Sequence, residues 1–386
     1  MPRFLRLLRR LRTRLARARH RALTPSARVA ILVTTVPPRD ANAAGFTANS
    51  SQPLRIGPAG WAYQDWAGVV YPAPRPRGFD PAAYLAQFFD TIEINSSFYH
   101  PFTAQQAKHF VERVAANSRF LFTAKLWQRF THDPGATAAD EREVRAGFDA
   151  LMSVGKLGAV LVQFPFAFHR TGRNIAHLAA LLRRFASYPL VVEFRHASWN
   201  APDTFALLRE WRAGFCNIDQ PVIGRSLEPS AHVTSDIGYV RLHGRRYDTW
   251  FASVKKPAPP KAFVRGERRD QQNADAEPRS ARDFFPQNEG AAIPAFERYN
   301  YLYSEEELRP WVARIENVHA QAKSTYVVTN NHYLGKGVVN ALQLISILKG
   351  AKIAIPDQLR EPYLQLNEIA ADPPATPTLF PMGKTK

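Results

Sequence analysis

Short apolar runs alternate with amphipathic stretches along this chain from Leu54 onward. Runs rich in Val, Ile and Phe, bounded by turn residues, predict strands at residues 55–59, 91–96, 121–126, 159–164, 190–196, 214–219, 239–244 and 325–331. Apolar positions repeat with helical spacing at residues 80–89, 104–116, 139–154, 174–187, 201–212, 304–323 and 337–349. Eight strands alternating with helices over about 300 residues predict an α/β fold, a (β/α)8 barrel of the TIM type.

An open, doubly wound sheet is the competing architecture for this alternation. The regularity of the eight units favours the closed barrel. No G-x-G-x-x-G sequence follows the first predicted strand, so the usual dinucleotide-binding fingerprint is missing at that position.

Three segments depart from the alternating pattern. Residues 1–52 form an Arg-rich extension, residues 245–303 form a long insertion loop after the seventh strand, and residues 351–386 form a C-terminal helix and a Pro-rich tail. We therefore expect the barrel to occupy residues 53–350, including the insertion. Loops of this length are typical of lids, interaction surfaces or partly disordered insertions.

The net charge of +18 is unevenly distributed. Residues 1–52 hold eleven arginines and one acid, Asp40, so this segment contributes +10. It is either a disordered tail ahead of the true start, or a basic arm that binds nucleic acid or an anionic membrane, or a targeting signal built around the apolar run at residues 29–36. The barrel itself is therefore only moderately basic.

Composition indicates a soluble globular protein. Hydrophobic residues make up 45% of the chain and charged residues 22%, and no apolar run is long enough to cross a membrane. The single cysteine, Cys216, excludes an internal disulfide and a cysteine-based zinc site. We expect a cytoplasmic protein.

Six of the predicted strands carry polar residues in the phase opposite to their apolar residues. Because side chains alternate across a strand, the polar phase is expected to face the barrel axis. It contains Glu93 and Asn95, Thr123 and Lys125, Gln163, Glu193 and Arg195, Asn217 and Asp219, and Arg241 and His243. Barrel interiors are usually filled by Val, Ile and Leu, so these residues indicate a functional site more than a purely structural ion network.

Several sequence runs resemble the YecE-like family, a group catalogued as domain of unknown function seventy-two. They are Ile56-Gly57 with Gly60-Trp61, Ile92-Glu93-Ile94-Asn95-Ser96-Ser97-Phe98-Tyr99, Thr123-Ala124-Lys125, Thr131-His132, Leu161-Val162-Gln163-Phe164-Pro165, Val192-Glu193-Phe194-Arg195-His196 with Trp199, Val240-Arg241-Leu242-His243-Gly244 and Asn330-Asn331. The resemblance covers about residues 54–350, in order, and implies a TIM-type barrel. It implies no established reaction.

Positive groups at the barrel mouth predict an anionic ligand. Arg195 and Arg241 are candidates to bind it, together with Asn330 and the turn at Gly335 and Gly337, which leads into a helix. Barrels commonly bind phosphate at the loops after the last two strands. An ordinary turn that needs glycine is the alternative interpretation of Gly335 and Gly337.

Proton chemistry has four candidate residues. Glu93, Glu193 and His243 are candidate acids or bases, and Lys125 is a candidate for a lowered pKa and a Schiff base. A salt bridge between Lys125 and Glu93 is the more ordinary interpretation. Aromatic residues follow the strand ends at Trp61, Phe98, Tyr99, Trp127 and Trp199, where they form either a stacking rim or packing.

A divalent metal ion is an open alternative. Oxygen and nitrogen donors occur at Glu93, Glu193, Asp219, His196 and His243, but no H-x-H or H-E-x-x-H spacing is present. The neighbouring cations would repel a metal ion, so no residue is assigned as a ligand.

We expect an enzyme that uses acid–base chemistry on a small phosphorylated or carboxylated substrate; lyase, isomerase and hydrolase all remain open. The predicted catalytic residues are Glu93, Lys125, Glu193 and His243. The predicted substrate-binding residues are Asn95, Gln163, Arg195, His196, Asp219, Arg241, Asn330, Gly335 and Gly337. The alternatives are a metal-dependent nuclease or phosphodiesterase, with nucleic acid bound through the basic arm, and a ligand-binding barrel without catalysis.

Overall fold

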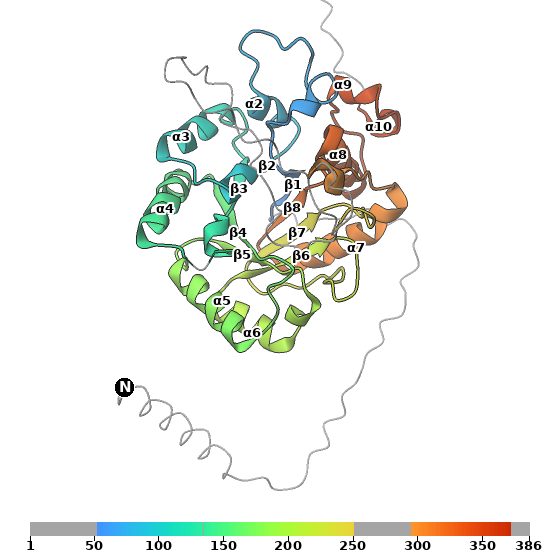
Figure 1. Ribbon diagram of the computed structural model, residues 1–386. Helices are drawn as coiled ribbons and strands as arrows, with labels where there is room; N and C mark the ends of the chain where they lie inside the picture. Colours follow the sequence, from blue (N-terminus) through green and yellow to red (C-terminus); the bar gives the residue numbers. More distant parts are fainter. Residues whose placement is uncertain (1–51, 134, 251–294, 372–386) are drawn as a thin grey trace, which may run out of the picture. The chain divides into compact units, whose positions relative to one another are not determined.

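The computed structural model describes residues 52–133, 135–250 and 295–371. Eight parallel strands form the centre of this unit, with helices arranged around them (Figure 1). The strands are β1 (Leu54–Pro58), β2 (Thr91–Ile94), β3 (Leu121–Lys125), β4 (Leu157–Gln163), β5 (Leu190–Glu193), β6 (Gly214–Asp219), β7 (Ile237–Leu242) and β8 (Ser324–Thr329). From β2 to β8 each strand pairs with its sequence neighbour, and β1 pairs with β8, so the predicted (β/α)8 barrel is confirmed.

The barrel closes between β1 and β2, where the pairing is shortest. Ala59 forms a parallel bridge with Glu93, and the Gly60 amide donates a hydrogen bond of 2.9 Å to the Glu93 carbonyl. Gly57 permits this approach because a Cβ atom there would lie 1.9 Å from the carbonyl oxygen of Thr91.

The helices of the outer layer lie close to the predicted positions. They are α2 (Pro81–Leu85), α3 (Ala104–Arg113), α4 (Ala138–Ser153), α5 (Gly172–Arg184), α6 (Pro202–Glu210), α7 (Glu305–Gln321) and α8 (Lys336–Lys349). Capping boxes fix three of their starts, at Thr103, Thr137 and Ser304. Two short helices, α9 (Asp357–Arg360) and α10 (Leu366–Ile369), follow, and α10 packs against α8.

Several strands end earlier than the apolar pattern predicts. β2 ends at Ile94, β5 at Glu193, β7 at Leu242 and β8 at Thr329. Four predicted site residues therefore lie just beyond the strands, in the loops at the carboxyl-terminal end of the barrel: Asn95, Arg195, His243 and Asn330. In TIM barrels this end carries the reactive groups.

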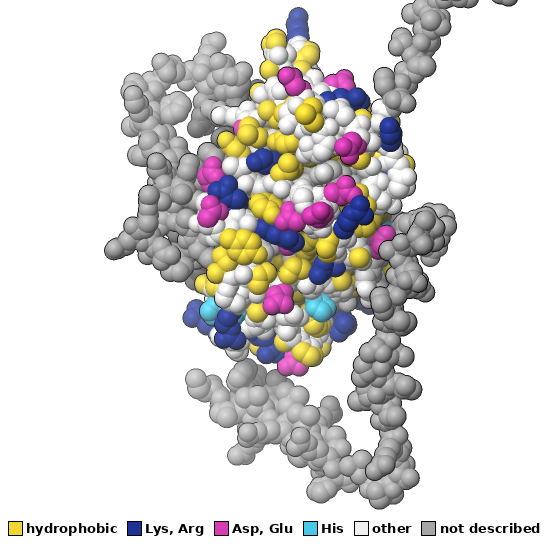
Figure 2. Space-filling view, turned by 90° about the vertical axis from the view of Figure 1, so that its right-hand side faces the viewer, with side chains coloured by type: hydrophobic (Ala, Val, Ile, Leu, Met, Phe, Trp, Pro, Cys, Tyr) yellow, Lys and Arg dark blue, Asp and Glu magenta, His cyan; other side chains and the backbone are white. Residues whose placement is uncertain are grey.

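The Arg-rich extension, most of the 245–303 insertion and the Pro-rich tail lie outside the described residues. On the face drawn in Figure 2, acidic and basic side chains are interspersed with hydrophobic ones. No helix in the described part of the chain is both long enough and apolar enough to span a bilayer.

Candidate functional site

Strand register identifies the side chains that enter the barrel, because side-by-side residues in a parallel sheet point to the same face. Glu93 is beside Thr123, and Glu193 is beside Gln163. Arg241 lies between Ile218 and Val328. Their contacts, described below, confirm that β2, β3, β5 and β7 send polar groups into the lumen, and the register places Gln163 of β4 in the same phase.

The predicted phase of β6 is wrong. Cys216 and Ile218 are the inward residues, and the Cys216 Sγ atom lies 3.9 Å from Glu193 Oε2. Asn217 faces outward, where it binds the backbone of His232, and Asp219 faces outward to Arg245, at 2.8 Å. Both phases of β6 are fully buried, so the alternation of polar and apolar residues did not indicate which phase faces the axis.

Arg241 lies at the centre of the lumen between two carboxylates. Its Nη2 atom is 2.6 Å from Glu93 Oε1, and its Nη1 atom is 2.7 Å from Glu193 Oε2. The Tyr239 hydroxyl donates a hydrogen bond of 3.1 Å to Glu93 Oε2. The side chains of Arg241, Glu93 and Glu193 are all 0% exposed. A buried charge of this kind is tolerated only when it is paired, and here the guanidinium is shared by both carboxylates.

Glu193 has two further neighbours. Arg195 Nη2 lies 2.7 Å from Glu193 Oε1, and His243 Nε2 lies 3.3 Å from the same atom. Burial raises the pKa of Glu193, but Arg195, Arg241 and His243 outweigh burial and hold this pKa well below its usual value. Glu193 is therefore ionised throughout the physiological range and is a weak base.

His243 is held in one orientation by Asn330. The Asn330 amide nitrogen lies 3.0 Å from His243 Nδ1. Because an amide nitrogen can only donate, the ring proton sits on Nε2, facing Glu193. Burial, together with the positive charge of Arg195, lowers the pKa of His243 to about 3. His243 is thus neutral at physiological pH, and Asn330 joins the cluster as predicted.

Lys125 does not form the expected salt bridge with Glu93. Its Nζ atom lies 3.3 Å from Asn95 Oδ1 and 4.1 Å from the centroid of the Phe98 ring. Within the described residues it forms no ion pair, because the carboxylates of Glu93 and Glu193 are bound by arginines. The pKa of Lys125 is lowered from its usual 10.5 to about 7, chiefly by burial; Arg241 and Arg195 also lower this pKa, and Glu93 and Glu193 raise it.

Arg195 is the least buried charged residue of this cluster. Its side chain is 13% exposed, it donates to Gln220, and it lies over the Trp250 ring at 5.5 Å. His132, after β3, is close enough to Lys125 and Arg195 for both to lower its pKa, which burial already depresses, to about 3. The Oε1 atom of Gln163 is buried and has no hydrogen-bond partner among residues 52–133, 135–250 and 295–371.

The structure uses two of the other predicted site residues to build turns. His196 accepts a hydrogen bond from the Ser198 amide and packs against His169, at 4.0 Å between ring centroids. Gly335 has a φ of +77° and lies against Val70, where a Cβ atom would be 2.5 Å from the valine side chain. These contacts are structural and support the turn interpretation of Gly335.

The start of α8 is also covered. The Leu334 amide donates to the Asp65 carboxylate, and the Tyr363 hydroxyl donates to the Leu334 carbonyl. Gly337 fits its helix against the backbone, since a Cβ atom there would lie 3.2 Å from the Thr329 carbonyl oxygen. Because a carboxylate of the chain already binds the turn before this helix, the predicted anion site at Gly335 and Gly337 loses its support.

The predicted aromatic rim is only partly present. Trp199 is fully buried between Phe168 and Phe194, and Trp61 packs against Phe110. Phe98, in contrast, faces Lys125. Trp61 and Trp199 therefore fill the core, whereas Trp127 is only partly buried.

The five candidate metal donors do not converge. Asp219 and His196 bind other partners, as described above, and both glutamates hold Arg241. In the part of the chain that the structure describes, no group of three His, Cys, Asp or Glu side chains is arranged to hold a metal ion. A guanidinium occupies the position between the carboxylates that a cation would need.

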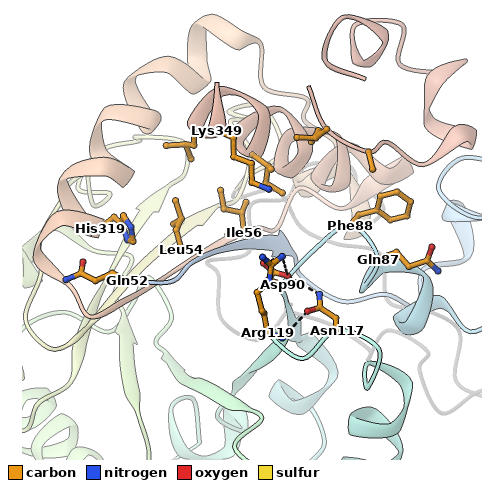
Figure 3. A pocket seen from close by; sticks show the side chains of 14 residues that line it. Gln52, Leu54, Ile56, Gln87, Phe88, Asp90, Asn117, Arg119, His319 and Lys349 are labelled. Carbon is orange, nitrogen blue, oxygen red and sulfur yellow. Dashed lines mark hydrogen bonds and ion pairs between the residues drawn. The ribbon is translucent and has the colours of Figure 1, made fainter. Parts of the chain in front are cut away.

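A cavity of about 510 Å3 lies at the opposite end of the barrel (Figure 3). Its lining includes Leu54 and Ile56 at the start of β1, and Asp90 and Arg119, which immediately precede β2 and β3. Asp90 is bound by Arg119 at 3.1 Å and by Asn117 at 2.9 Å. Asp90 and Arg119 thus pair with each other, and none of the lining residues belongs to the Glu93–Arg241–Glu193 cluster.

Three residues that lie at the charged cluster were not identified from the sequence: Tyr239, Cys216 and His132. Tyr239 shares the phase of Arg241 along β7, so its inward direction was available from the alternation. Cys216 was missed with the phase of β6. His132 lies in a loop, beyond any strand periodicity.

Comparisons with known proteins agree with this architecture. The family model described as "Protein of unknown function DUF72" matches residues 55–363. UPF0759 protein YunF of Bacillus subtilis is 26% identical over 311 residues, which cover 76% of this chain and 94% of that protein.

Two solved structures are similar. A DUF72 family protein from Thermotoga maritima is 27% identical with a TM-score of 0.59, covering 77% of this chain and 99% of that one. A DUF72 family protein from Enterococcus faecalis is 20% identical with a TM-score of 0.57, covering 79% and 98%, and it shares the fold.

Proposed function

Since residues 55–363 match its family model, this chain belongs to the DUF72 family of proteins of unknown function, and we propose that it is an enzyme that performs acid–base chemistry on a small anionic substrate. The reaction takes place at the carboxyl-terminal end of the barrel, with Lys125 as the group that exchanges a proton. The observation that carries this proposal is the Lys125 amine, which is buried without a carboxylate partner in the described residues and has a pKa of about 7.

The charge balance of the cluster favours an anionic substrate. Arg195 and Arg241 balance Glu93 and Glu193, so a protonated Lys125 is one positive charge in excess. An isolated buried charge is costly, and the cost is removed either by loss of the proton or by binding of an anion. Arg195, the partly exposed cation, is the group we assign to the anion.

The roles of the remaining residues follow from their bonds. Arg241 is fully buried and both of its terminal nitrogens bind carboxylates, so it positions Glu93 and Glu193 and does not touch the substrate. His243 is neutral and bound by Asn330, and it positions Glu193. Lys125 alone in this cluster has a pKa near neutrality, where a general acid or base is most effective.

Anion binding is the first test. Inorganic phosphate, glycerol 3-phosphate, pyruvate and malonate are titrated into the protein at pH 7, and binding is followed by the rise in melting temperature. We expect at least one of them to bind, and Arg195→Met and Lys125→Met each to weaken that binding at least about tenfold. Arg119→Met, at the opposite end of the barrel, is the matched control and should leave binding unchanged.

Turnover is the second test. Any anion that binds is incubated with the protein and followed by proton NMR in deuterated water, where exchange at a carbon next to a carbonyl or carboxylate reports proton transfer. Equal binding to wild type, Arg195→Met and Lys125→Met contradicts the proposed site. Binding that depends on both residues, without any exchange or turnover, favours the ligand-binding barrel without catalysis.

A further inference from the structure

The contacts of the Lys125 amine leave its lone pair available when the amine is neutral. It ends β3 at the carboxyl-terminal side of the barrel, and its residue is only 5% exposed. Its one hydrogen bond within the described part of the chain is long, at 3.3 Å to Asn95 Oδ1, and an aromatic ring covers one side at 4.1 Å. Asn95 and Phe98 thus fix the direction of the amine without neutralising it.

We infer that Lys125 forms an imine with its substrate, and that the substrate class is therefore a small anionic aldehyde or ketone. This inference rests on the proposed function, because it needs both the anion position at Arg195 and the amine at Lys125. It extends that function by changing the amine from a proton carrier into a nucleophile.

The covalent step balances as follows. The neutral amine attacks the carbonyl carbon, a C–N bond forms, and the π-electron pair moves to the carbonyl oxygen. A proton passes from nitrogen to that oxygen to give a carbinolamine. The oxygen then takes up a second proton and leaves as water, while the nitrogen lone pair forms the C=N bond. In sum, protonated Lys125 and the carbonyl compound give the protonated imine and one water.

Three neighbours suit this intermediate. The carbinolamine carries a hydroxyl group that needs an acceptor, and the Oε1 atom of Gln163, on the adjacent strand β4, is buried and without a partner among the described residues. The protonated imine keeps the positive charge of Lys125, so Glu93 and Glu193 favour it as they favour the protonated lysine. No redox partner or metal ion is required.

Trapping by reduction tests the imine directly. The full chain is incubated with glyoxylate at pH 7 and sodium cyanoborohydride, which reduces an imine to a stable secondary amine, and labelled lysines are located by peptide mass spectrometry. We expect Lys125 to be labelled at least about ten times faster than Lys108, whose side chain is 69% exposed, because an exposed lysine is almost fully protonated at this pH.

The pH dependence of labelling and three variants complete the experiment. Labelling of Lys125 should rise with a midpoint near pH 7, well below the pKa of about 10.4 of a lysine side chain in a model peptide. Lys125→Met should abolish the fast label, and Lys108→Arg should preserve it. Arg195→Met should slow labelling by glyoxylate, but not by the neutral aldehyde formaldehyde. If Lys125→Met does not fold, the pH profile of the wild type still decides.

The outcomes separate the two proposals. If Lys125 is not labelled faster than Lys108, while anions still bind in an Arg195-dependent manner, the imine is wrong and the proposed function stands. If neither labelling nor anion binding depends on Lys125 and Arg195, both are wrong. Fast labelling that does not respond to Arg195→Met retains the imine and overturns the anionic substrate class.

Discussion

The two ends of the barrel differ in how deeply their paired charged side chains are buried. At the amino-terminal end, a cavity of about 510 Å3 is lined by polar and apolar residues alike, and the side chains of its Asp90–Arg119 pair are 27% and 75% exposed. At the carboxyl-terminal end, Glu93, Glu193 and Arg241 are completely buried in the lumen. This cavity is therefore separate from the cluster of buried charges.

The difference shows which observation identifies a site. Open space at the amino-terminal end needs no compensation, since water can fill it and solvated ions cost little. Buried ions cost much more and persist only when other groups hold them, so their presence points to a requirement beyond folding. Lys125 is the strongest example, because it is a buried amine that pairs with no carboxylate in the described residues.

The largest expected effect is a loss of stability in acid that arises from buried histidines. His132, His243 and His332 each have a pKa of about 3, because burial disfavours the imidazolium ion. The unfolded chain binds their protons below pH 6.5 and the folded chain does not, so the free energy of unfolding falls between about pH 6.5 and 3. Three protons correspond to about 4 kcal/mol per pH unit. Urea denaturation at pH 7, 6 and 5 measures this loss.

Single variants assign the acid sensitivity to the carboxyl-terminal end. His243→Gln should reduce the slope by about one proton, and His109→Gln, a matched change of a half-exposed histidine, should leave it unchanged. A free energy of unfolding that is constant between pH 6.5 and 5 would show that these histidines accept protons in the folded state.

Removal of one arginine from each end should have the next largest effect. Arg241→Met leaves two buried carboxylates unpaired, and we expect a loss of about 3–5 kcal/mol in the free energy of unfolding. Arg119→Met removes an exposed pair and should cost less than about 1 kcal/mol. Denaturant unfolding at pH 7 measures both, and equal losses would refute the contrast between the two ends.

Lys125→Met should have a smaller, pH-dependent effect on stability. Because its pKa is lowered to about 7, folded Lys125 loses its proton while unfolded Lys125 keeps it up to about pH 10.5. The free energy of unfolding of the wild type should therefore rise relative to Lys125→Met by about 2–3 kcal/mol from pH 7 to 9. Lys108→Met, the exposed control, should show a constant difference.

Sequence alternation predicted the barrel and most of its lumen. Glu93, Glu193 and Arg241 follow apolar neighbours with the period of a strand, and their convergence needs only a closed barrel. The rule failed at β6, where Asn217 and Asp219 are buried outside the lumen because a loop backbone and Arg245 satisfy them. Phase there is set by pairing with β7, which the sequence of β6 does not contain.

The bonding partners inside the lumen were less predictable. Lys125 and Glu93 lie on adjacent strands, so a salt bridge was the simplest interpretation. In the structure, Glu93 instead forms an ion pair with Arg241, whose side chain extends across the lumen from β7. Which basic residue pairs with a given carboxylate depends on how far each side chain extends within the closed barrel. The lowered pKa of Lys125, which has no carboxylate partner in the described residues, depends on the same geometry.

The titration of Lys125 tests the central claim most directly. Lysine side chains labelled with 13C are followed by NMR from pH 5 to 11, and the Lys125 signal is assigned by its disappearance in Lys125→Arg. We predict a midpoint near 7 for Lys125, as burial and the two arginines require, well below the pKa of about 10.4 of a lysine side chain in a model peptide. A midpoint near 10 for Lys125 would contradict both the proposed acid–base role and the imine.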